Sequence, residues 1–326
     1  MNQTATASLY TRTKSFAQDN PIKSWYYVLS SSFFLIAALA ATLPAFPIGL
    51  RIASSGLAGL LIVRMFVIYH DQQHRAILPK SKLAELYMRV FGIWVLCPSS
   101  VWRSTHDYHH ANNSKLRGTH VGSYPIMTKE QYRASSRLKR FTYLFTRHPI
   151  TMVFGYVFVF LFSMVVHPLM LGFREHYDCL ISLLVHFVLA TLMVIYFGWI
   201  AMVLTLILPM SIASALGAYL FYAQHNFPGV VFKDKDGWTH EKAALESSSH
   251  LVTGPVLAWF TGNIGYHHIH HLNHRIPFYR LPEAYRATAE LQKAKTITLR
   301  PSDILRCLSL KVWCPETQQM VGIRGL

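Results

Sequence analysis

The chain has 326 residues, of which 52% are hydrophobic and only 14% are charged. Ordinary soluble domains carry about 25% charged residues, so this composition argues against a soluble domain and favours an integral membrane protein. The 31 Lys and Arg outnumber the 15 Asp and Glu, and we expect this basic charge to face membrane lipid, not nucleic acid. The four cysteines form no CxxC pair, which argues against a zinc ribbon or a disulfide framework.

The first apolar stretch is long enough to cross a bilayer twice, since one helical span takes about 20 residues. Residues 25–69 are therefore predicted to form a first membrane hairpin with a tight turn at Pro47. Residues 1–24 precede it as a cytoplasmic N-terminal segment. Arg51 and Arg64 lie near the two ends of the second span and are predicted to snorkel to the membrane surface.

A second long apolar stretch covers residues 180–222 and is twice the length of one span. It is predicted to be a second hairpin that turns near Gly198. Two other apolar runs, 91–102 and 152–166, are shorter than the length of one helical span. We expect them to be re-entrant or interfacial, and we assign residues 149–179 to the interface.

The basic residues predict the orientation of these helices. They are concentrated in 70–148 and 223–326, whereas the two hairpin turns carry almost none. Basic segments remain in the cytoplasm, so both polar segments and both termini are predicted to be cytoplasmic. Four spans satisfy this arrangement and a fifth at 152–166 does not. The predicted fold is one all-α integral membrane domain over 1–326, with four transmembrane helices in two hairpins and a cytoplasmic helical cap.

Nine histidines are clustered beside the ends of the predicted spans, in the motifs YHDQQH, THDYHH, QHNFPG and YHHIHH. Residues spaced i, i+3 and i+4 share one face of a helix, so each motif can direct two or three imidazoles at one point. The nine are His70, His74, His106, His109, His110, His225, His267, His270 and His271. All lie on the predicted cytoplasmic side, which indicates one shared site in the cap.

Imidazole suits zinc, copper, iron and nickel, whereas calcium and magnesium prefer oxygen. One tetrahedral zinc needs four ligands, so nine histidines predict two metal ions. The HExxH motif of zinc proteases is absent, and two redox-active irons with open positions would suit activation of O₂. Asp71 and Asp107 follow the first histidines of two motifs and are expected to accept hydrogen bonds from ligand rings. The alternative is that both aspartates are simply solvated.

The motifs HDxxH, HxxHH and a second HxxHH, interleaved with two membrane hairpins, resemble the membrane-bound fatty acid desaturase family over residues 25–290. The stretch GNIGYHHIHHLNHRIP is similar to its acyl-lipid, methyl-end (Δ12 or ω-6) branch. The resemblance implies O₂-dependent insertion of a double bond into a long acyl chain by two irons held by the nine histidines. Zinc can replace iron in such a site. Phe221 stands where the stearoyl-CoA branch has an Asn, so that residue is not carried over.

The resemblance also implies an acyl tunnel and an external electron donor. Trp94, Trp102, Tyr108 and Tyr266 are candidate tunnel residues. The chain contains no flavin, haem or iron–sulfur motif, so electrons are expected from a ferredoxin or cytochrome b5 type of protein. The basic stretch 129–147, which contains Arg137, Lys139 and Arg140, is predicted to attract such an acidic carrier.

Other histidines are weaker candidates: His268 in a spacer position, then His274, His240, His250, His120 and His186. Two other functions remain open. Hydroxylases and ketolases of alkanes, sterols or carotenoids use the same motifs. A membrane metal transporter or a bis-histidine haem protein would place its ligands at mid-membrane depth, where only His186 is expected.

Overall fold

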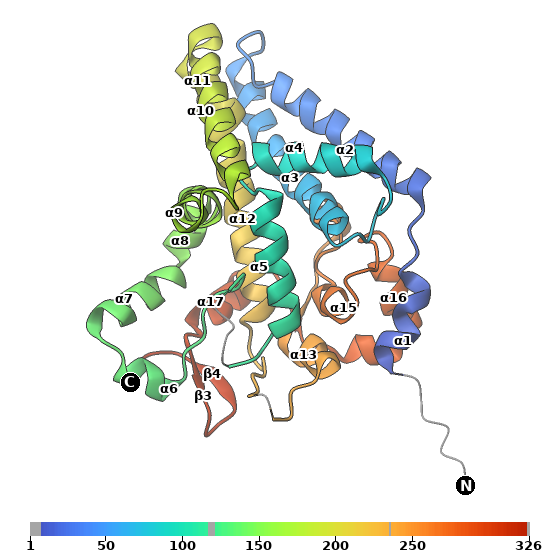
Figure 1. Cartoon of the computed structure of the whole chain (residues 1–326), viewed down its shortest axis with the longest axis vertical. Coiled ribbons are helices and arrows are strands. Elements are labelled where there is room, and N and C mark those ends of the chain that lie inside the picture. Colours follow the sequence, from blue (N-terminus) through green and yellow to red (C-terminus); the bar gives the residue numbers. More distant parts are fainter. Residues whose placement is uncertain (1–7, 117–120, 235, 325–326) are drawn as a thin grey trace.

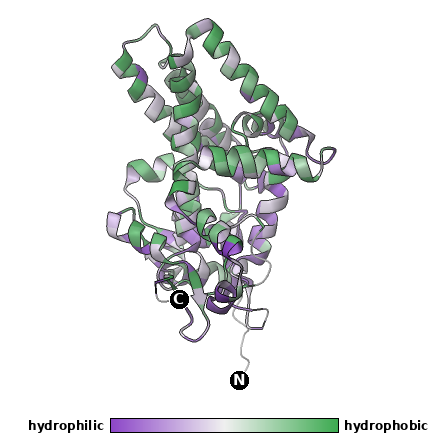
Figure 2. Cartoon of the chain, turned by 90° about the vertical axis from the view of Figure 1, so that its left-hand side faces the viewer, coloured by the Kyte–Doolittle hydropathy of each residue, from purple (hydrophilic) through white to green (hydrophobic). Residues whose placement is uncertain are grey.

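The computed structural model describes residues 8–116, 121–234 and 236–324, and it is mostly helical. The long helices extend to one end of the molecule, and most of the short helices gather at the other (Figure 1). Hydrophobic residues dominate the end with the long helices, whereas hydrophilic residues gather at the opposite end (Figure 2). We call these the apolar end and the polar end.

Four helical segments are long and apolar enough to cross a membrane, which confirms the four predicted apolar helices. They are α2 (Pro21–Ala40), α3 (Ile48–Gln73), α10 (Tyr177–Phe197) and the continuous helix Trp199–His225. The last comprises α11 (Trp199–Met202), a π-helical turn (Val203–Ile207) and α12 (Leu208–His225). Pro209 has no N–H for the carbonyl one turn earlier, which explains the π-helical turn just before it.

The ends of α2 and α3 follow from local sequence. Asn20 caps α2 by accepting a hydrogen bond from the Lys23 N–H at 3.1 Å. α3 continues to Gln73, four residues beyond the predicted end of the span. This extra turn carries His70 and leaves His74 as the C-cap residue, so the helix itself aims the first histidines.

α3 packs closely against α12. A Cβ atom on Gly59 would lie 2.8 Å from the Ile212 side chain, so this approach requires glycine. The largest buried apolar cluster joins α2, α3 and α12 and continues into α4 (Lys82–Trp94). Because α3 and α12 both carry histidines at their polar ends, this rigid core positions the candidate site.

The environment of Arg64 differs from the predicted one, because its side chain is buried in the protein. Only 2% of the residue is exposed, and its Nε donates to Ser31 Oγ at 2.9 Å. The guanidinium also donates to the Trp259 carbonyl and lies 3.9 Å above the ring of that residue, on α14 (Pro255–Phe260). The prediction that Arg64 snorkels is wrong, because Trp259 supplies an acceptor and an aromatic face inside the protein.

The second long apolar stretch turns where it was predicted to turn. α10 ends at Phe197, and Gly198 adopts a φ of 82°, which favours glycine. Residues Tyr156–Leu171 form a shorter apolar helix, which comprises a π-helix (Tyr156–Val166) and α9 (His167–Leu171). The apolar run 91–102 is divided between the end of α4 and the start of the next helix.

The remaining elements are short. The helices are α1 (Leu9–Thr13), a 3₁₀ turn (Lys14–Phe16), α5 (Ser99–Asn112), α6 (Lys129–Ala134), α7 (Arg137–Thr146), α8 (Pro149–Val153), α13 (His240–Ser247), α15 (His267–Leu272), α16 (Leu281–Ala287), a second 3₁₀ turn (Ala289–Lys293) and α17 (Pro301–Ser309). Two small sheets pair β1 (His250–Leu251) in parallel with β2 (Thr296–Ile297), and β3 (Val312–Cys314) antiparallel with β4 (Gln319–Val321). These strands depart from the all-α prediction, and each is too short to show an alternating pattern.

Candidate metal centre

The ends of α3, α5, α12 and α15 meet at the polar end of the molecule and bring the nine predicted histidines together. The imidazoles form two groups, and within each group one ring nitrogen per residue lies within 4.8 Å of the others. The first group contains His70, His74, His106, His110 and His270. The second group contains His109, His225, His267 and His271.

Each HxxHH motif serves both groups, which differs from the expectation that one motif converges on one point. On α5, His106 and His110 belong to the first group and His109 to the second. On α15 the roles are reversed, because His267 and His271 belong to the second group and His270 to the first. Residues four apart face one point, and the residue between them is rotated toward the other point.

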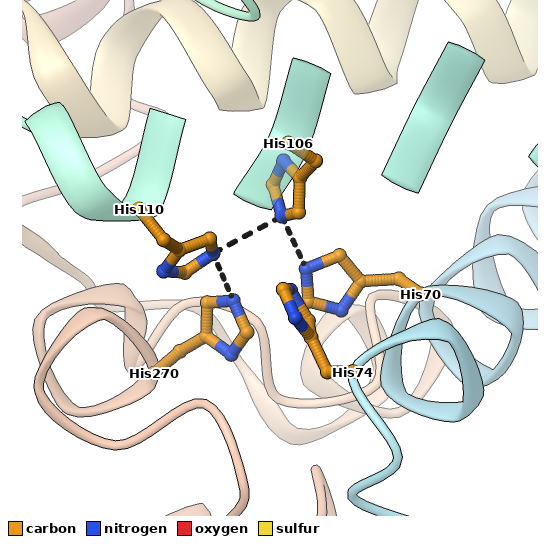
Figure 3. A group of neighbouring side chains, drawn as sticks. All are labelled: His70, His74, His106, His110 and His270. Atoms are coloured by element: carbon orange, nitrogen blue, oxygen red, sulfur yellow. Dashed lines mark hydrogen bonds between the residues drawn. The ribbon is translucent and has the colours of Figure 1, made fainter. Parts of the chain in front are cut away.

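The first group is shown in Figure 3, where rings from three segments of the chain point toward one another. The Nε2 atom of His106 lies 3.0 Å from that of His70 and 3.1 Å from that of His110. The Nε2 atoms of His110 and His270 are 3.0 Å apart. His74 Nε2 has no hydrogen-bond partner among the described residues.

The second group is equally compact. The Nε2 atom of His225 lies 2.9 Å from that of His267 and 3.1 Å from those of His109 and His271. His271 Nε2 also lies 3.2 Å from His267 Nε2 and 3.3 Å from His109 Nε2. All four rings therefore present Nε2 to one small volume.

These distances test whether the residues fit a metal ion. Bonds from zinc to imidazole nitrogen are about 2.0–2.1 Å, so donors around one ion lie about 2.8–3.4 Å apart for right-angle to tetrahedral geometry. The Nε2–Nε2 distances of 2.9–3.3 Å agree with this spacing. Lone pairs that face one another at this distance repel unless a cation or a proton lies between them. The donor set fits two transition-metal ions.

The rings of His70 and His225 are oriented by contacts at Nδ1, the ring nitrogen that points away from the other histidines. His70 Nδ1 lies 3.1 Å from Asp71 Oδ1, and His225 Nδ1 lies 3.1 Å from the Ser247 carbonyl oxygen. A ring that donates from Nδ1 keeps the lone pair of Nε2 for a metal. Asp71 is 1% exposed, and its other carboxylate oxygen accepts from the Phe278 N–H at 2.6 Å.

Asp107 contributes much less than Asp71. Its carboxylate oxygen is 3.8 Å from His74 Nδ1, which is beyond hydrogen-bond distance, and its side chain is 61% exposed. Asp71 is therefore within hydrogen-bond distance of a candidate ligand ring, whereas Asp107 is mainly exposed to solvent.

Burial keeps seven of the candidate ligands neutral. It lowers their pKa well below the ordinary histidine value, and nearby imidazoles lower the pKa further; the seven are His74, His106, His109, His110, His267, His270 and His271. A neutral imidazole is the form that binds metal, so no proton has to be displaced at neutral pH.

The weaker histidine candidates that the structure describes lie outside both groups. His268 is fully buried, and its Nε2 bonds to the Leu291 carbonyl at 2.9 Å. His274 is the nearest, with its ring centre 4.8 Å from that of His74. The others have different partners: His240 contacts the Leu272 carbonyl, His250 stacks on Tyr266, and His186 contacts the Tyr156 hydroxyl. His120 is outside the described residues.

Of the four aromatic tunnel candidates, Trp102 is the one whose ring contacts a ring of either group. It stacks on His106 with ring centres 4.2 Å apart and planes at 15°. Trp94 contacts Phe91, Tyr108 is 39% exposed, and Tyr266 stacks on His250. Phe221, which was set apart from the stearoyl-CoA branch by sequence, places its ring 5.1 Å from that of His109.

Arg147 is a positioning residue that the sequence did not reveal. It is fully buried and donates to Asn226 Oδ1 at 2.6 Å and to the Pro125 carbonyl at 3.0 Å. Asn226 directly follows His225 and donates to the Cys307 carbonyl at 2.7 Å. Arg147 therefore fixes the end of α12, and in the sequence it is one basic residue among many.

Comparisons with known proteins agree with this geometry. The profile of the fatty acid desaturase family matches residues 44–302. The chain is 31% identical over 278 residues to a fatty acid desaturase of Bacillus subtilis, covering 85% of this chain and 78% of that protein. It is 24% identical to an sn-1 oleoyl-lipid 12-desaturase of Picosynechococcus, covering 85% and 80%. It is also 24% identical to a chloroplastic omega-6 fatty acid desaturase of Glycine max, covering 85% and 65%. The chain, with its histidine motifs gathered at one site, belongs to the fatty acid desaturase family.

Proposed function

We propose that this fatty acid desaturase acts on acyl chains carried by membrane lipids, with two iron ions and O₂. The observation that carries the proposal is the convergence of nine histidines on two neighbouring points. Eight of the nine residues are buried and His225 is half-buried, so bulk water is kept from the reacting atoms.

The chain's own groups have defined roles in this proposal. The first group would hold one iron and the second group the other, with Asp71 orienting His70 and the Ser247 carbonyl orienting His225. Bound iron would supply the activation of O₂ needed to remove hydrogen from unactivated C–H bonds. Trp102, stacked on His106, limits the ring's rotation and adds an apolar wall beside the site. Zinc in a preparation would be a substitute and not a contradiction.

The membrane arrangement is part of the proposal. α2 with α3, and α10 with the helix Trp199–His225, would form two hairpins that cross the bilayer. The polar end, which contains the histidines and most of the basic residues, would be a cytoplasmic cap. The four apolar helices and the polarity of the molecule support this arrangement (Figure 2).

The substrate is proposed from the relatives. Two of them are named for ω-6 or oleoyl-lipid 12 desaturation, and each match covers 85% of this chain. We therefore place the chain in the methyl-end branch and expect it to add a second cis double bond to an oleoyl chain. An external one-electron carrier would supply the electrons.

The test is expression in a host whose lipids contain oleoyl chains but no dienes. Gas chromatography of its lipids should detect a new diene, and replacement of His109 or His270 with Ala should abolish it. His167 is exposed and outside both groups, so His167→Ala is the matched control and should keep the wild-type yield. Immunoblots of membranes should show equal amounts of each variant.

Other outcomes separate the alternatives. A hydroxylated or keto product in place of a diene would assign the chain to the hydroxylase or ketolase chemistry. Full activity of His109→Ala or His270→Ala would exclude the proposed metal centre. A monoene formed from saturated chains would keep the desaturase and overturn the methyl-end assignment.

A further inference from the structure

A surface pocket of about 440 Å³ opens beside the first histidine group. Its walls include Lys14, from the 3₁₀ turn after α1, and Arg75 and Arg275, which directly follow His74 and His274 in the chain. All three basic residues are exposed. α1, which precedes the turn that carries Lys14, lies beside α16 at the polar end (Figure 1).

The three cations have no acidic partner. Among the described residues, ion pairs engage Arg12, Arg89 and Arg280 but not Lys14, Arg75 or Arg275. Asp19 also lines the pocket, but its carboxylate is occupied by other donors, which are Ser24 Oγ at 2.5 Å, the Leu78 N–H at 2.7 Å and the Tyr279 hydroxyl at 2.9 Å. These donors are neutral and leave the charge of Asp19 in place, so the pocket presents three cations without ion-pair partners beside one carboxylate, a net positive charge on a concave surface.

The pocket floor is closed but close to the candidate metal centre. Asn273 and Ala76 line the floor, and each is only 2% exposed. His274 follows Asn273 in the chain, and its ring centre lies 4.8 Å from that of His74 and 5.4 Å from that of His110. An acyl chain cannot pass a packed floor, whereas an electron can tunnel across a few packed rings.

We propose that the basic pocket of Lys14, Arg75 and Arg275 is the docking site for an acidic one-electron carrier protein that reduces the metal centre. The proposal rests on the desaturase function proposed above. Carrier complexes of this kind are small and weak, often burying less than about 1,200 Å², so a compact cationic patch is sufficient. Steering by opposite charge would then give fast, salt-sensitive association.

The basic stretch 129–147 fits a different partner. On α7, the exposed residues Leu138 and Phe141 stand among Arg137 and Lys139, with 72% and 65% of the two apolar residues accessible. A short helix with apolar and basic residues of this kind suits the interface of an anionic bilayer. We therefore expect α7 to contact lipid, and its basic residues supply the control for the pocket.

The electron count defines what the carrier must deliver. Removing two hydrogens from adjacent methylenes yields two electrons and two protons and leaves a double bond. Reduction of O₂ to two waters takes four electrons and four protons. The carrier therefore supplies the other two electrons, one at each of two docking events, and solvent supplies two protons.

The test compares two triple variants of the full-length, iron-loaded protein in nanodiscs. One is Lys14→Gln/Arg75→Gln/Arg275→Gln, and the other is Arg137→Gln/Lys139→Gln/Arg140→Gln. Both remove three positive charges, so a difference between them reports location and not net charge. Turnover is measured against the concentration of a reduced plant-type ferredoxin. The pocket variant should raise the apparent KM for ferredoxin roughly tenfold, as expected for loss of steering charges, and the α7 variant should change it less than about twofold.

A second readout locates the carrier without relying on turnover. Zero-length carbodiimide cross-linking should join Lys14 to a ferredoxin carboxylate, and the conjugate is identified by mass spectrometry. Lys14→Gln should lose this cross-link. If no host or carrier yields a desaturated product, the proposed function fails, and the cross-link still decides the docking site.

Three results would overturn the docking proposal. They are an unchanged ferredoxin KM in the pocket variant, a larger effect of the α7 variant, or cross-links at Lys129 or Lys139 in place of Lys14. A pocket variant that raises the KM for the acyl lipid alone would assign the pocket to a phosphate-bearing headgroup instead.

Discussion

Asp71 and Asp107 each follow the first histidine of a motif, yet the fold places them in different environments. Asp71 is buried between His70 Nδ1 and the Phe278 N–H, whereas Asp107 is largely exposed and 3.8 Å from His74. In Asp71→Asn, the amide must turn its NH₂ group toward one of two donors. Loss of such an outer hydrogen bond typically weakens metal binding about 10–100-fold. We expect this loss in iron retained against a chelator, measured by mass spectrometry.

The matched control is Asp107→Asn, which makes the same chemical change at the exposed position. It should alter iron retention by less than about twofold, because no hydrogen bond is lost. Equal losses in the two variants, with unchanged helical content, would show that the burial of Asp71 has no bearing on metal binding.

At the scale of single residues, the sequence predicted which histidines come together but not how they are divided. The i, i+3 and i+4 spacings place three rings on one helical face, and this is a property of one helix alone. The division of the histidines between two groups depends on how α3, α5, α12 and α15 are placed relative to one another. No local sequence pattern encodes that placement. Arg64 and Arg147 were missed for the same reason, because their partners Trp259 and Asn226 are distant in sequence.

The packing of α3 against α12 makes a prediction at the scale of elements. Ala at position 59 would put a Cβ 2.8 Å from Ile212 and 3.1 Å from the Pro209 carbonyl, and overpacking of this kind costs about 1–3 kcal/mol. Gly56 is on the same helix, and a Cβ atom there would have no other atom within 4 Å. Gly56→Ala should therefore raise the free energy of unfolding by about 0.5–1 kcal/mol through higher helix propensity. The unfolding temperature, followed by tryptophan fluorescence in detergent, should fall for Gly59→Ala and stay or rise for Gly56→Ala. A rise in both variants would mean that the two helices are not in contact at this point.

Element boundaries were predictable where composition alone determines them. The lengths of the apolar stretches gave four helices, and Gly198 marked the turn between the last two. The continuation of α3 to Gln73 was not predictable, because its last turn is polar in sequence and becomes buried only against α5 and α15. β1 and β2 were missed because they pair segments that are distant in sequence, His250 with Thr296. β3 and β4 form a hairpin, and they were missed because strands of three residues are too short to show an alternating pattern.

At the scale of the whole molecule, an apolar half and a polar half follow one another along the long axis (Figures 1 and 2). The candidate histidines lie at the polar ends of α3 and α12 and on the short helices beside them. In the proposed function, an acyl chain would approach the histidines from the apolar side. The carrier would dock at the basic pocket of Lys14, Arg75 and Arg275, which lies in the N-terminal segment and in the loops that follow α3 and α15. The two partners would then not compete for the same surface.

The same polarity predicts which segments face which side of the membrane. Ala45 lies in the turn between α2 and α3, Tyr196 is near the turn at Gly198, and Glu130 and Thr317 lie at the polar end; all four residues are exposed. The native cysteines are all buried, so they can remain during cysteine labelling. With a membrane-impermeant maleimide, Ala45→Cys and Tyr196→Cys should label in intact cells. Glu130→Cys and Thr317→Cys should label only after permeabilisation, because basic segments stay in the cytoplasm. Opposite sidedness of positions 130 and 317 would show that Tyr156–Leu171 crosses the bilayer as a fifth span, and the proposed cytoplasmic cap would then be divided between two compartments.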